Sequence, residues 1–161
     1  MKIYISYFYQ IRFFTPNMIP LSTCCSDPAW FHDFTRDKSY RFQDKRGVWN
    51  GLRAEPFMPG FLCDGLCTGP QNCEIKDPNE CDFLKAYRMQ LNMLDFEEIM
   101  QRFERLGKVV QEKTGFFEEP IPVLIVYETP SNPCSERRVM IDWFASHGYE
   151  LEEWTKNSGQ S

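Results

Sequence analysis

A run of five apolar residues after Pro122, VLIVY at positions 123–127, constrains the fold of this chain more than any other feature. Strands of parallel sheets are buried on both faces and therefore read as continuous apolar runs. The run predicts a central strand of a parallel sheet. A polar segment, ETPSNPCSERR at positions 128–138, follows it immediately.

Strand patterns also occur near the start of the chain. β-branched and aromatic residues predict a first strand over residues 3–9 and a second strand over residues 19–23. Asp27 followed by Pro28 is typical of a helix start and predicts one or two helical turns over residues 29–34.

Helical patterns precede the central strand. Apolar residues at helical spacing predict a helix over residues 82–94. Asp95 and Glu98 resemble a capping box and predict the start of a second helix. This helix either ends at Gly107 or continues beyond it.

A third helix is predicted after the central strand. Asn132 and Pro133 are a typical N-cap and first helical residue, and Gly148 is a typical stop. Residues 149–154 then predict a final strand. Strands at both ends with helices between them indicate an α/β fold.

We therefore expect a single Rossmann-like domain over residues 1–154, with a mostly parallel sheet flanked by helices. Residues 36–80 show no sustained periodicity and are expected to form a long irregular insertion that contains several cysteines. Residues 155–161 are expected to form a flexible tail.

Composition excludes some classes of protein. The 161 residues carry 18 Lys and Arg against 23 Asp and Glu, and this net charge of -5 argues against a protein that coats nucleic acid by bulk charge. Polar residues and prolines interrupt the apolar start of the chain, and no stretch is long enough to span a membrane. An odd count of seven Cys favours a reducing compartment. We expect a cytoplasmic protein without a membrane partner.

The segment after the central strand is the first candidate site. In parallel sheets, ligands bind beyond the carboxyl ends of the strands, where the next helix offers free N–H groups. Glu128 at the strand end is a candidate general base. The candidate residues for holding a phosphate are Ser131, Asn132, Cys134, Ser135, Arg137 and Arg138.

A second interpretation of this segment is purely structural. Asn132 and Ser135 would then only cap a helix, and Glu136 would pair with the arginines at the surface. The two interpretations differ in what a substitution does. A ligand-binding Arg137 should lose ligand affinity on replacement by Ala, at little cost to the fold.

Four cysteines lie close together in the irregular segment, and they are Cys63, Cys67, Cys73 and Cys81. Four thiolates can close a tetrahedral site for a structural zinc ion, which would stabilise a loop that buries little. Their spacing lacks paired Cys-x2-Cys motifs, so independent thiols are an equal alternative, and an iron–sulfur cluster is a third.

Three stretches together resemble the domain of unknown function 488 family of bacteria, archaea and phages. They are KIYISYF at 2–8, PAWF at 28–31 and PVLIVYETPSNPCSERRVMIDW at 122–143. The family pattern runs from a hydrophobic strand through Tyr-Glu, a proline-containing turn and Cys-His-Arg to a helix with an acidic residue and Trp. The residues in register with it are Tyr127, Glu128, Arg137, Asp142 and Trp143.

The chain departs from the family at one place, because Ser135 and Glu136 occupy the positions of the Cys-His pair and Cys134 lies one place early. The resemblance implies a Rossmann-like fold and a connection with nucleotides or nucleic acids, and it implies no specific reaction. It covers both ends of the chain and the central helices, and it does not cover the cysteine-containing segment.

Two functions follow as expectations. The first is binding of a phosphorylated ligand, either a nucleotide or a nucleic-acid end, at the turn after the central strand, with or without catalysis. The alternative is a non-enzymatic interaction module, in which a zinc-stapled cysteine loop and surplus aromatic residues bind a protein partner. The sequence leaves the oligomeric state open.

Overall fold

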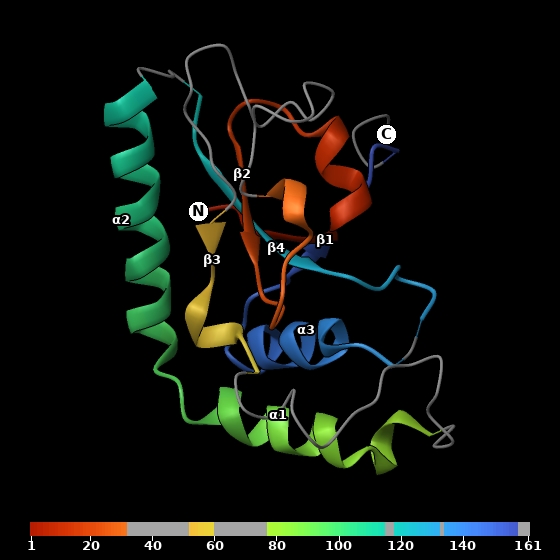
Figure 1. The fold of residues 1–161 in the computed structure, drawn as a ribbon. Helices are drawn as coiled ribbons and strands as arrows, with labels where there is room; N and C mark the ends of the chain where they lie inside the picture. Colours follow the sequence, from red (N-terminus) through yellow and green to blue (C-terminus); the bar gives the residue numbers. More distant parts are fainter. Residues whose placement is uncertain (32–51, 60–76, 115–117, 133, 158–161) are drawn as a thin grey trace.

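The structure is a computed structural model that describes residues 1–31, 52–59, 77–114, 118–132 and 134–157. The described residues form a five-stranded sheet in which all neighbouring strands are parallel (Figure 1). Its strand order is β3-β2-β4-β1-β5. The expected α/β, Rossmann-like fold is confirmed. The strands are β1 (Tyr4–Tyr7), β2 (Met18–Ser22), β3 (Leu52–Arg53), β4 (Ile121–Val126) and β5 (Glu152–Glu153).

Strand β4 is central, as its apolar run predicts. It pairs with β2 on one side and β1 on the other, and the side chains of residues 123–126 are buried. Because β4 lies between β1 and β2, the chain passes from one of its neighbours to the other before β4 is added. The sheet is therefore complete only when β4, which comes later in the sequence, lies between β1 and β2.

Helices cover the sheet on different sides. Helix α2 (Phe96–Thr114) stands beside it, whereas α3 (Glu136–Ser146) and α1 (Asp82–Asn92) pack on one another near the ends of the strands (Figure 1). Asp95 accepts hydrogen bonds from the N–H groups of Glu97 and Glu98, so the predicted start of α2 is confirmed. The helix continues through Gly107.

The first predicted strand is too long. It ends at Tyr7, and the chain then forms a short 3-10 helix, η1 (Phe8–Phe13), before β2 begins. Aromatic and β-branched residues over 3–9 fit a strand locally, but the side chains of Phe8 and Ile11 are buried from the 3-10 helix instead. Residues 29–31 form a second 3-10 helix, η2 (Ala29–Phe31), in the place where helical turns were expected.

The segment 36–80, expected to be irregular, contributes to the sheet and the core. It contains the edge strand β3 and the 3-10 helices η3 (Glu55–Phe57) and η5 (Pro78–Glu80). Phe57 is 1% exposed and lies between helices, with ring-centroid distances of 6.3 Å to Phe103 of α2 and 5.9 Å to Phe144 of α3. A segment without periodicity thus supplies a central aromatic residue.

The start of α3 also differs from the prediction. Its N-cap is Ser135, whose Oγ accepts a hydrogen bond from the N–H of Arg137, and not Asn132. Asn132 instead accepts a hydrogen bond from the N–H of Cys134 within the preceding turn. The end of the helix is as predicted, because Gly148 follows it with a positive φ of 80°, which favours glycine.

We predict that Tyr87→Phe lowers the free energy of unfolding by about 1–3 kcal/mol. The hydroxyl of the fully buried Tyr87 donates a 2.6 Å hydrogen bond to the carbonyl of Phe57, and the substitution leaves that buried carbonyl without this donor. Urea unfolding of the variant and of Tyr9→Phe, a control at an exposed position, measures the difference. Equal stability of both variants would contradict a role for this hydrogen bond in joining η3 to α1.

Candidate functional site

The carboxyl ends of the strands form one edge of the sheet. Tyr7 pairs with Val126, Ser22 pairs with Ile125, and Arg53 pairs with Ser22. Segments that follow β1, β2, β3 and β4 therefore begin side by side. Ligands of open parallel sheets bind at this edge.

Glu128 and Ser135 bring the end of β4 to the start of α3. The Ser135 hydroxyl donates a 3.2 Å hydrogen bond to Glu128 Oε2 and accepts a 3.1 Å hydrogen bond from the N–H of Arg137. Ser135 is buried and Glu128 is half-buried. The hydroxyl thus joins a carboxylate to the N-terminus of the helix.

Glu136, the first residue of α3, carries a second carboxyl group beside Glu128. Burial, and then the charge of Glu128, raise the pKa of Glu136 from 4.5 to about 7, although the backbone and Arg137 oppose the shift. Burial and the charges of Glu136, Glu128 and Asp27 also raise the pKa of the Cys24 thiol well above its ordinary value. Cys24 is therefore a neutral thiol, which disfavours a role as a nucleophile.

Arg137 is the second residue of α3 and is 5% exposed. Its Nε forms an ion pair with Glu153 Oε1 of β5, and its guanidinium lies 5.8 Å from the ring centroid of Tyr7, the last residue of β1. All three of its guanidinium nitrogens, Nη1 and Nη2 included, and both carboxylate oxygens of Glu153 are buried without a hydrogen-bond partner among the described residues. A buried guanidinium with two unused donor groups is costly, because the lost contacts with water are not replaced.

The sequence alone predicted that Arg137 could be replaced at little cost to the fold, but its burial beside Glu153 leads us to expect a loss of stability instead. Glu153 is half-buried beside Arg137, with both carboxylate oxygens buried, and burial raises the pKa of Glu153 to about 7 even though the guanidinium opposes the shift. Removing Arg137 alone leaves the Glu153 carboxyl buried without its partner, a change that costs about 3–5 kcal/mol in buried pairs.

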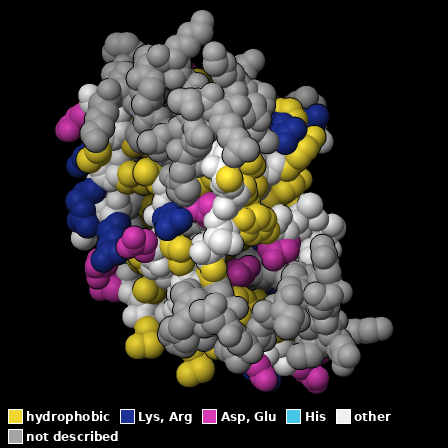
Figure 2. All heavy atoms as spheres, viewed as in Figure 1, with side chains coloured by type: hydrophobic (Ala, Val, Ile, Leu, Met, Phe, Trp, Pro, Cys, Tyr) yellow, Lys and Arg dark blue, Asp and Glu magenta, His cyan; other side chains and the backbone are white. Residues whose placement is uncertain are grey.

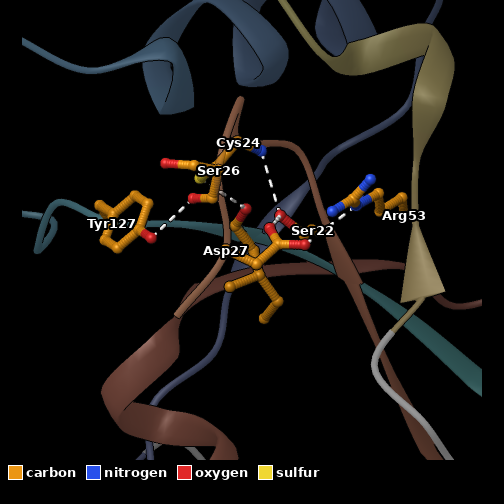
Figure 3. A network of polar contacts seen from close by, with 7 residues as sticks. Ser22, Cys24, Ser26, Asp27, Arg53 and Tyr127 are labelled. Carbon is orange, nitrogen blue, oxygen red and sulfur yellow. Dashed lines mark hydrogen bonds and ion pairs between the residues drawn. The ribbon is translucent and has the colours of Figure 1, made fainter. Parts of the chain in front are cut away.

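A further polar network, which the sequence did not indicate, lies at the ends of β2 and β3 (Figure 3). The Asp27 side chain is 2% exposed, forms a short hydrogen bond with the Ser22 hydroxyl and accepts a 3.0 Å hydrogen bond from Arg53 Nε. The N–H of Cys24 donates to the same Ser22 hydroxyl at 3.1 Å. Asp27, predicted only as a helix start, therefore fixes Arg53 on the neighbouring strand.

The loop after β2 is also tied to the end of β4. The Tyr127 hydroxyl donates a 2.6 Å hydrogen bond to the carbonyl of Ser26 (Figure 3). The Thr23 hydroxyl donates to the carbonyl of Ile125 at 2.9 Å. These bonds hold the loop that carries Asp27 beside the segment that carries Glu128.

The remaining predicted ligand residues are spread along the turn. Ser131 is exposed, and its hydroxyl oxygen lies 2.9 Å from the hydroxyl oxygen of Thr129. Cys134 and Arg138 are both half-buried, and Arg138 lies on α3. The structure thus brings together Glu128, Ser135 and the start of α3. It turns Arg137 toward β1 and β5, and not toward the outer part of the turn.

The predicted zinc site falls mostly outside the described residues. Cys63, Cys67 and Cys73 lie in the part of the chain that is not described, and Cys81 is a buried free thiol at the N-cap of α1. Within the described ranges, no group of three or more His, Cys, Asp or Glu side chains is placed to hold a metal ion. Cys25 is disulfide-bonded, whereas the odd count of cysteines favoured a reducing compartment.

Comparisons with protein-family models, curated proteins and solved structures find no match to this chain. The resemblance to the domain of unknown function 488 family therefore stays a prediction, carried by the residues quoted above. None of the helices in the described ranges is both long enough and apolar enough to span a membrane.

We predict that the protein loses stability as the pH rises from about 4.5 to about 7. The pKa of Glu136 is raised on folding, so the folded state binds its proton more tightly in this window and the stabilisation disappears as the proton leaves. The loss should be about 1–3 kcal/mol, to which Glu153 contributes with the same sign. Chemical unfolding between pH 4.5 and 8 measures how the free energy of unfolding changes with pH.

The matched variants are Glu136→Gln, which should flatten this pH dependence, and Glu104→Gln at an exposed position of α2, which should leave it unchanged. Stability that rises with pH across the window, or an unchanged slope in Glu136→Gln, would contradict a raised pKa at Glu136.

Proposed function

We propose that the chain binds a phosphorylated ligand, a nucleotide or a nucleic-acid end, at the carboxyl edge of the sheet between β4, β1 and α3. The observation that carries the proposal is the buried guanidinium of Arg137, whose Nη1 and Nη2 atoms have no hydrogen-bond partner among the described residues. Two parallel N–H groups on one guanidinium match two oxygens of a phosphate.

The surroundings of Arg137 support an anion as the missing partner. Glu153 forms an ion pair with Nε but makes no hydrogen bond with the guanidinium, and the Tyr7 ring contributes a weaker electrostatic attraction than a second anion would. Arg137 also lies in the first turn of α3, an 11-residue helix whose dipole favours negative charge at this end. A phosphate beside Arg137 would use both sources of positive potential.

The carboxylates next to α3 give the proposed site its second part. Two ionised carboxylates near a phosphate would repel it, but Glu136, with its pKa near 7, is substantially protonated at neutral pH. Glu128 then remains as the candidate general base, held by the Ser135 hydroxyl at 3.2 Å. This arrangement supports a site in which binding and proton transfer are done by different residues.

We predict that Arg137→Lys weakens binding of nucleoside monophosphates about tenfold or more, because lysine keeps the charge but loses the paired N–H geometry. Glu153→Gln should strengthen the same binding, because it removes a negative charge beside the guanidinium while keeping a hydrogen-bond acceptor. Isothermal titration with a panel of nucleoside monophosphates, and with inorganic phosphate, measures both effects.

The control is Arg88→Lys, since Arg88 also forms an ion pair, with Asp142 at 2.9 Å, but on the α1–α3 surface. The Arg88→Lys variant should bind nucleoside monophosphates with the same affinity as the unmodified protein. If Arg137 has only a structural role, both variants will change the unfolding transition. Arg137→Lys will then not weaken the binding of nucleoside monophosphates, and Glu153→Gln will not strengthen it. That result, or the absence of phosphate binding to the folded unmodified protein, would contradict the proposal.

A further inference from the structure

A separate cavity of about 220 Å³ lies between the β2–β3 side of the sheet and α2. Its walls come from the end of β2, the segment from β3 to η3, and one face of α2. The apolar lining residues are Leu21, Ala54, Pro56, Phe57, Ile99, Phe103 and Leu106. The cavity is lined on the β3 side, and not by the β1 and β5 residues that surround Arg137.

The floor of the cavity is part of the hydrophobic core. Leu21, Phe57, Ile99 and Phe103 are all less than 7% exposed, yet they face an unfilled space. The space is partly open to solvent, so these side chains lack apolar contacts on that side. An apolar group that entered the space would leave water and supply such contacts.

Charged side chains at the cavity indicate what kind of molecule would fit. Arg53 and Arg102 line it from opposite walls, and both side chains are about half exposed. Figure 2 shows Lys and Arg side chains along the edge of this face where α2 lies, with acidic and hydrophobic side chains among them. Glu55 is the one acidic residue among those that line the cavity.

Both arginines have unused donors. Arg53 pairs with Asp27 through Nε, and Arg102 pairs with Glu98 through Nη2. The other guanidinium nitrogens of these two residues have no partner among the described residues. The buried Asp27, in the loop after β2, holds Arg53 in place (Figure 3). An apolar space between two such groups favours a ligand with an apolar body and an anionic end.

We propose that this cavity binds a small amphipathic carboxylate, with one aromatic ring or a short aliphatic chain in the apolar space. The carboxylate lies between Arg53 and Arg102 and accepts hydrogen bonds from their free donors. This site is independent of the phosphate site, because the two share no residue.

The test uses phenylacetate and hexanoate as probes, with 2-phenylethanol and hexanol as their neutral counterparts. Methyl NMR signals of Leu21, Ile99 and Leu106 should shift saturably with the carboxylates, at affinities about tenfold higher than for the alcohols. Arg102→Gln should reduce the carboxylate affinity about tenfold, whereas Arg105→Gln, an exposed control on the same helix, should not.

A second experiment fills the cavity. Ala54→Leu adds side-chain volume there and should abolish the binding of carboxylates and alcohols alike. If Ala54→Leu does not fold, Arg102→Gln still tests the site. Three results would overturn the proposal: no saturable shift of these methyl signals, equal affinity for acids and alcohols, or Arg102→Gln and Arg105→Gln behaving alike.

Discussion

The burial of the Arg137 guanidinium is the constraint on which the candidate site depends. A guanidinium stays charged at any physiological pH, so burying it requires anions or hydrogen-bond acceptors nearby. Glu153 supplies one carboxylate and joins α3 to the last strand through an ion pair, but no nitrogen of the guanidinium has a hydrogen-bond partner among the described residues. The pair therefore fixes the position of the helix and at the same time leaves a demand for a second anion at the edge of the sheet.

The parallel sheet determines which residues lie together at this edge. With β4 between β1 and β2, the chain segments around Tyr7, Ser22 and Glu128 begin at one edge although they are far apart in the sequence. Hydrogen bonds from Tyr127 to Ser26 and from Ser135 to Glu128 then tie these segments together.

The sequence predicted the features that follow from local pattern. The apolar run of β4, the helical spacing of α1 and the Asp95 cap of α2 all report on short-range structure, and each was confirmed. Strand β3 and Phe57 were missed because two-residue strands and single core aromatics have no periodicity. Asp27 was read only as a helix start because its partners, Ser22 and Arg53, are set by strand pairing.

The most direct test of the account is to observe the Arg137 side chain by ¹⁵N NMR while inorganic phosphate is added at neutral pH. The account predicts a saturable shift of its Nη signals and slowed rotation of the guanidinium, while the Arg88 signals stay unchanged. Unchanged Arg137 Nη signals at phosphate concentrations that saturate any other response of the protein would contradict it.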